Sequence, residues 1–64
     1  MTLKEKLRAE RVKKGVSQTK VAEDLGLTQP TIAKYENGIL TPLADTIVAL
    51  ADYYGVTTDY LLRD

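Results

Sequence analysis

The fold is decided by residues 18–37, which read QTKVAEDLGLTQPTIAKYEN. Two segments of this stretch suit short helices, and Gly26 stands between them. Glycine readily adopts the left-handed conformation that a tight turn between helices needs. Ala22 is small enough to let two helix backbones approach, and the apolar residues Leu27 and Ile32 hold the second helix in place. These features predict two helices that cross at about 90–120° around a glycine-containing turn.

Cap residues and glycines divide the whole chain into short segments of helical length. Serine and threonine favour the N-cap of a helix, and glycine favours the position after its last turn. The predicted N-caps are Thr2, Ser17, Thr28, Thr41 and Thr57. At the first of them, Thr2 and Glu5 have the spacing of a capping box. The predicted helices cover residues 3–14, 18–25, 29–36, 42–54 and 58–62.

The fourth segment carries the clearest apolar stripe. Pro42 suits a first helical position, where its missing N–H is not needed. The stripe consists of Leu43, Ile47, Leu50, Ala51 and Tyr54. No segment shows the sustained alternation that is typical of a strand. The sequence therefore predicts an all-α fold, a compact bundle of five short helices in one domain over residues 1–64. The second and third helices form a helix-turn-helix.

The composition argues against several classes of function. The chain has neither cysteine nor histidine, so we expect no disulfide, no zinc site and no enzyme that uses the commonest general base or a thiol nucleophile. No glycine-rich phosphate loop is present, and we expect no cofactor and no small-molecule ligand. No apolar run approaches the ~20 residues of a membrane span, and Asp45 and Asp52 interrupt the most apolar stretch. We therefore expect a cytoplasmic protein that has no contact with a membrane.

The net charge of zero conceals a strong asymmetry along the chain. Residues 1–20 carry seven cationic and two anionic side chains, whereas residues 21–64 carry two and seven. A chain polarised in this way can present a basic face to an anionic partner while it stays neutral overall. The alternative interpretation is a solvated helix with mixed charges, and charge alone favours this alternative.

On these features the chain resembles the lambda-repressor-like helix-turn-helix family, which includes phage repressors, Cro proteins and Xre-type regulators. The resemblance covers nearly the whole chain. Each matching position is weak alone, but together their order and spacing are specific. The matching positions are Arg11, Gly15 to Gln18, Val21, Ala22, Gly26 to Thr28, Ile32, Tyr35 to Gly38, Pro42, Leu50, Ala51 and Tyr60 to Leu62.

The resemblance implies a regulator of transcription, more in keeping with a repressor of phage or prophage type than with an activator. Its recognition helix, at about residues 29–36, would lie in the major groove of double-stranded DNA. The expected base contacts come from Gln29, Thr31 and Lys34. A glutamine amide can bond N6 and N7 of adenine together, and lysine can reach guanine or a phosphate.

Phosphate contacts would hold the recognition helix in register. The resemblance assigns them to Gln18, Thr28 and Asn37. Gln18 and Thr28 also stand at helix starts, where free N–H groups and the positive end of the helix dipole attract anions. Lys20 lies on the exposed face of the second helix and is a further candidate. Without the resemblance, each of these residues would be read as a helix cap or an ordinary surface residue.

The resemblance implies one ion pair, and the chain departs from the family pattern at two places. Arg11 and Glu36 would form a partly buried ion pair that joins the first helix to the end of the third. Pro30 replaces a polar base reader of similar repressors and offers apolar contact only. Residues 39–41 are apolar where relatives often carry lysine or arginine, which argues against backbone contacts from this loop.

The expected partner is a two-fold symmetric operator bound by a homodimer, because one such domain reads only a few base pairs. Residues 56–62 are the candidate dimer contact, with Tyr53 or Tyr60 as the exposed aromatic residue. The alternative is that Leu61 or Leu62 completes the core of the monomer. A rival function is that of a protein-interaction module, such as an antitoxin, with little or no DNA binding. The polar pair of Gln29 and Lys34 favours DNA over this rival.

Overall fold

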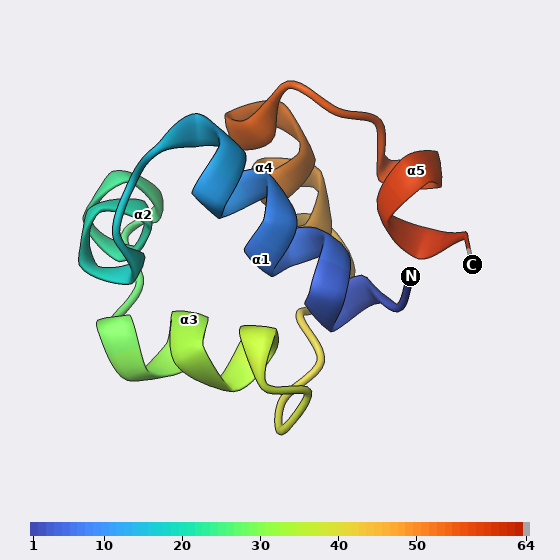
Figure 1. Ribbon diagram of the computed structural model, residues 1–64. Helices are drawn as coiled ribbons and strands as arrows, with labels where there is room; N and C mark the ends of the chain where they lie inside the picture. Colours follow the sequence, from blue (N-terminus) through green and yellow to red (C-terminus); the bar gives the residue numbers. More distant parts are fainter. Residues whose placement is uncertain (64) are drawn as a thin grey trace.

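Five helices make up the computed structural model, which describes residues 1–63 (Figure 1). They are α1 (Leu3–Lys14), α2 (Gln18–Leu25), α3 (Gln29–Glu36), α4 (Ala44–Tyr54) and α5 (Thr58–Leu62). The prediction of an all-α bundle of five short helices is confirmed, and four of the five helices have the predicted bounds. α1 occupies the middle of the fold and contacts α3, α4 and α5, while α2 packs against α3 (Figure 1).

The start of α4 was predicted wrongly. The helix begins at Ala44, with Leu43 as its N-cap, and not at Pro42 after a cap by Thr41. The side chain of Pro42 is buried, and it lines a small cavity together with Leu3 and Tyr35. This packing keeps Pro42 in the preceding loop. Leu43 therefore has an extended backbone and is 74% exposed, so its predicted place in the apolar stripe is also wrong.

The other predicted caps are present. The hydroxyl oxygens of Ser17, Thr28 and Thr57 each accept a hydrogen bond from the backbone N–H three residues later. At the start of α1, the Glu5 carboxylate accepts hydrogen bonds from the backbone N–H and the hydroxyl of Thr2, both at 2.9 Å. These contacts satisfy N–H groups that have no partner inside their own helix. Because each contact joins residues only three apart, the local sequence was enough to predict these four helix starts.

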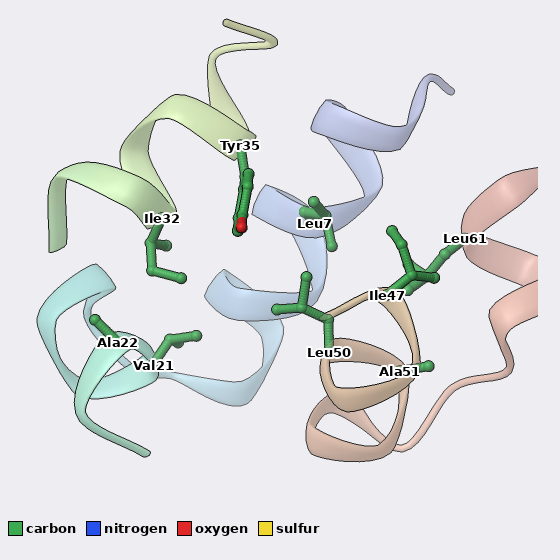
Figure 2. Packing of buried hydrophobic residues seen from close by; sticks show 9 residues of the cluster. All are labelled: Leu7, Val21, Ala22, Ile32, Tyr35, Ile47, Leu50, Ala51 and Leu61. Carbon is green, nitrogen blue, oxygen red and sulfur yellow. The ribbon is translucent and has the colours of Figure 1, made fainter. Parts of the chain in front are cut away.

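The hydrophobic core draws side chains from all five helices, and Figure 2 shows them turned toward a shared interior. Its buried members are Leu7, Val21, Ala22, Ile32, Tyr35, Ile47, Leu50, Ala51 and Leu61. Leu61, from the short α5, completes the core of the monomer as the sequence allowed. Its neighbour Leu62 is instead 62% exposed. Within residues 1–63, no helix has both the length and the apolar character that a membrane span requires.

A buried lysine fixes α5 to α1. Lys6 Nζ donates hydrogen bonds to the backbone oxygens of Tyr60, at 2.7 Å, and of Arg63. The ammonium group also lies 5.0 Å from the centre of the Tyr60 ring. The Tyr60 hydroxyl donates to Glu10 Oε2 at 3.3 Å. A cation at the carbonyl end of a helix is stabilising, so Lys6 caps α5 from outside.

A second polar cluster joins α4 to α2. The Tyr53 hydroxyl donates to Asp24 Oδ2 at 2.7 Å, and Lys20 Nζ lies 3.1 Å from Asp24 Oδ1. Lys14 Nζ lies 5.0 Å from the centre of the Tyr53 ring. Burial and the hydrogen bond to Asp24 raise the pKa of Tyr53 to about 12. The same hydrogen bond, with help from Lys20, lowers the pKa of Asp24.

The raised pKa of Tyr53 predicts a loss of stability at alkaline pH. Its contribution is fully present below pH 10, the usual pKa, and is lost as the pH rises toward about 12. In this window the unfolded chain has released the phenolic proton while the folded chain still holds it. We expect Tyr53→Phe to decline less over this window than the wild type. Urea unfolding at a series of pH values measures the difference, and parallel curves would contradict the assignment.

Candidate nucleic-acid interface

The turn between α2 and α3 has the geometry that the sequence predicted. Gly26 takes a left-handed conformation with φ of +70°, which favours glycine. The N–H of Leu27 then donates to the Ala22 carbonyl at 2.8 Å, which closes the end of α2. Ala22 is buried where α2 meets α3. The two helices are thus held as a crossed pair, and α3 runs along an outer edge of the molecule (Figure 1).

Arg11 and Glu36, for which the sequence predicts an ion pair, form one. Arg11 Nε donates to Glu36 Oε2 at 2.7 Å, and a terminal guanidinium nitrogen donates to Oε1 at 3.1 Å. The other terminal nitrogen donates to the Val16 carbonyl at 2.9 Å. The two side chains are only 15% and 3% exposed. The hydrogen bond to Glu36 raises the pKa of Arg11 above its usual value. The pair ties α1, the loop before α2 and the end of α3 together.

Two glutamines extend this pair to the start of α3. Gln18 Nε2 donates to Glu36 Oε1 at 3.2 Å, and Gln29 Nε2 donates to Gln18 Oε1 at 2.8 Å. We call Glu36, Gln18 and Gln29 the glutamine relay. An amide nitrogen carries two hydrogens and an amide oxygen accepts bonds. In Gln29, therefore, the relay uses one N–H, and the second N–H and the oxygen have no partner within residues 1–63 at an exposed position.

Sequence reasoning named the members of the relay but missed the hydrogen bonds among them. Gln18 and Gln29 each occupy the first position of a helix. The crossing of α2 and α3 brings these two helix starts together, although they are eleven residues apart. A pair of long amide side chains at the first residue of both helices was the signal available in the sequence.

The remaining candidate base contacts lie along α3. The hydroxyls of Thr28 and Thr31 are 2.8 Å apart and share a hydrogen bond, and Thr31 is half-buried. Pro30 is exposed in the first turn of the helix. Lys34 is exposed and forms no ion pair or side-chain hydrogen bond within residues 1–63. Its ammonium group is therefore available to an external partner.

The other candidate phosphate contacts differ in whether their side chains already have a partner within the protein. Asn37 is exposed and is the C-cap of α3, directly after Glu36. Lys20 is exposed on α2, but its ammonium group is paired with Asp24. In the loop after α3, Ile39 is 72% exposed, and Leu40 is exposed as well. The structure thus brings Gln18 and Gln29 into contact, leaves Lys34 and Asn37 open, and engages Lys20 elsewhere.

Comparison with known proteins gives relatives that are all described as helix-turn-helix proteins or phage regulators. The profile of the helix-turn-helix family HTH_3 matches residues 7–61. The prophage-derived regulator YonR of Bacillus subtilis is 41% identical over 59 residues, which is 92% of this chain and 55% of YonR. The regulator ImmR of the same organism is 37% identical over 97% of this chain and 49% of its own. The phage CTXphi repressor RstR of Vibrio cholerae is 36% identical over 92% and 53%.

These curated relatives are longer proteins, and the chain spans about half of their length. Among solved structures, the P22 c2 repressor in complex with a synthetic operator superposes with a TM-score of 0.93. It is 25% identical, and the match covers 98% of this chain and 96% of the repressor chain. The profile match and the identities above 30% lead to one assignment. The chain belongs to the lambda-repressor-like helix-turn-helix family.

Proposed function

We propose that the chain binds double-stranded DNA in a sequence-specific manner through α3 and acts in the cytoplasm as a transcription regulator of phage or prophage repressor type, not as an enzyme. The observation that carries this proposal is the glutamine relay, which holds the amide of Gln29 at the start of α3 with a donor and an acceptor free. The likeness to a repressor described in complex with a synthetic operator supports it.

The free groups of Gln29 match the major-groove edge of adenine. Adenine presents the N7 acceptor and the N6 donor there, and one amide can bond both. The hydrogen bond to Gln18 reduces the rotamer freedom of Gln29 before DNA arrives, which lowers the entropic cost of binding. Further along α3, the methyl group of Thr31 suits a thymine methyl, and Lys34 suits guanine or a phosphate.

Phosphate contacts follow from the positions of the helix ends. Gln18 and Thr28 stand at the starts of α2 and α3, where backbone N–H groups and the positive ends of the dipoles attract phosphates. The exposed amide of Asn37 serves the other end of α3. Lys20 shares its ammonium group with Asp24, so we expect a smaller contribution from it.

Binding to random-sequence duplex DNA tests the proposal. The observed association constant, followed by fluorescence anisotropy over a series of KCl concentrations, should fall with a log–log slope of about −0.9 for each neutralised phosphate. Selection from a random DNA pool should then return one preferred sequence. A chain that binds no duplex even at the lowest salt would contradict the proposed function.

A two-fold operator bound by two copies of the chain is the expected form of the complex. The apolar groups that α5 exposes are Leu62 and the ring of Tyr60. The hydroxyl of Tyr53 is instead hydrogen-bonded to Asp24. We expect Leu62→Glu to weaken the complex of two chains on the selected operator while the melting temperature stays the same. Sedimentation velocity with labelled DNA measures this stoichiometry. One chain per operator for the wild type would contradict the dimer.

The exposed apolar loop after α3 favours one rival function. Ile39 and Leu43 are among the most exposed apolar residues of the structure, and such residues favour a protein partner. A protein-interaction module of antitoxin type would use this loop and would have no need for a free amide on Gln29. Weaker binding to the selected operator in Gln29→Ala, with wild-type binding to it in Ile39→Ser, would argue against the rival.

A further inference from the structure

The two ends of α3 differ in what they offer to DNA. A helix of eight residues is about 12 Å long, comparable to the width of the major groove. When its first turn faces the bases, its last turn and the following loop lie near a phosphate strand. The carbonyl end of a helix dipole repels anions. Residues 38–43 contain no cationic side chain and expose Ile39 and Leu43. This loop therefore has no positive charge of its own, and the last turn of α3 carries Lys34.

Lys4 of α1 lies at this end. A Cβ atom placed on Gly38 would come within 2.8 Å of Lys4 Cδ and 3.5 Å of Lys4 Nζ, so the lysine side chain lies across the loop at that glycine. Lys4 also lines a cavity of about 190 Å³ between the start of α1 and this loop, and Thr41 lines the same cavity. Gly38 has no side chain, which makes room for the lysine, and its φ of +74° favours glycine at this position.

Most other cations of the protein already have partners. Four pair with carboxylates, one caps α5 and one lies over an aromatic ring; they are Arg11, Lys13, Lys20, Arg63, Lys6 and Lys14. Lys4 is exposed and forms no ion pair within residues 1–63, even though Glu5 is its neighbour. The Glu5 carboxylate is held by two hydrogen bonds from Thr2. The ammonium group of Lys4 is thus free at the point where the loop lacks charge.

We infer that Lys4 binds a phosphate of the DNA backbone beside residues 38–41 and supplies from α1 the charge that this loop lacks. The inference rests on the DNA-binding function proposed above. It adds a contact from a helix outside the helix-turn-helix. The competing explanation is structural, because an ammonium group beside the last turn of α3 can also stabilise that helix by its dipole. The two explanations differ in whether DNA binding or folding depends on Lys4.

The test compares Lys4→Gln with two matched variants, Lys4→Arg and Lys13→Gln. Lys13 lies on the same helix and its side chain is 74% exposed. Its change to glutamine removes the same charge as Lys4→Gln. Binding to a random-sequence duplex is measured by anisotropy over a series of KCl concentrations, and melting is followed by circular dichroism. We expect Lys4→Gln to reduce the log–log salt slope by about 0.9, which is one phosphate. Lys4→Arg and Lys13→Gln should keep the wild-type slope, and Lys4→Gln should keep the wild-type melting temperature.

Four results would overturn the inference. An unchanged slope in Lys4→Gln, with DNA binding intact in the wild type, would remove Lys4 from the interface and leave the proposed function standing. An equal reduction in Lys13→Gln would show an effect of overall charge only. A lower melting temperature with an unchanged slope would support the structural explanation. If the wild type bound no duplex, the proposed function would fail, and the inference with it.

Discussion

Arg11→Ala is expected to lower the free energy of unfolding by about 3–5 kcal/mol, because it leaves the buried Glu36 carboxylate without its cation. Glu36 is only 3% exposed, and within residues 1–63 Gln18 would remain as the single hydrogen-bond partner of its carboxylate. The Val16 carbonyl would lose a partner as well. At about 0.05–0.15 kcal/mol per residue, a chain of this length has a total stability of the same order as this loss. The variant should therefore be largely unfolded at a temperature where the wild type is folded.

Urea unfolding and thermal melting measure this loss, with about 4–8 °C expected for each kcal/mol. Arg8→Ala serves as the control, since Arg8 is exposed on the same helix and makes no ion pair within residues 1–63. The double variant Arg11→Met with Glu36→Leu should lose less than Arg11→Ala, because it removes both charges together. A stability of Arg11→Ala equal to that of Arg8→Ala would refute the structural role of the pair.

Gln29→Ala is expected to weaken binding to the selected operator by about 1–3 kcal/mol, or roughly 5- to 150-fold, while it leaves the melting temperature nearly unchanged. Gln29 is exposed, and its one side-chain hydrogen bond within the described residues is to Gln18. Its removal therefore costs the fold little and costs the complex a bidentate base contact. Anisotropy with the operator obtained by selection gives the affinity.

Binding of the same variant to a random-sequence duplex is the internal control for Gln29→Ala. That affinity rests on phosphates and should change little. Equal losses on both duplexes would mean that Gln29 positions the backbone and does not read a base. Equal losses of melting temperature in Gln29→Ala and Arg11→Ala would refute the division between a structural pair and a reading residue.

Features that depend on neighbouring residues were predictable from the sequence. A cap and a glycine act over a few residues, so four helices were located with their observed bounds. The prediction for the start of α4 failed because the helix start depends on contacts with residues that are distant in sequence. Pro42 suits a first helical position, but it packs near Leu3 and Tyr35, and that tertiary packing sets the helix start.

The same distinction holds for the interface. The resemblance to a family supplied Arg11 and Glu36 as a pair, and the structure shows the contact. Contacts between residues far apart in sequence were not foreseen. Among them are the bond from Gln18 to Glu36 and the capping of α5 by Lys6, which span 18 and up to 57 residues. Composition and periodicity carry no information about such pairings, because these depend on how the helices cross.

The central position of α1 has a consequence for protein engineering. The crossed helices α2 and α3 have eight residues each, and helices of that length are marginal by themselves in water. Their orientation is fixed by the ion pair from Arg11 of α1 to Glu36 and by a core that all five helices share. A graft of residues 17–37 onto a foreign scaffold would transfer the side chains proposed to contact DNA without the contacts that support them. A working chimera must import α1, or a surrogate for it, along with the motif.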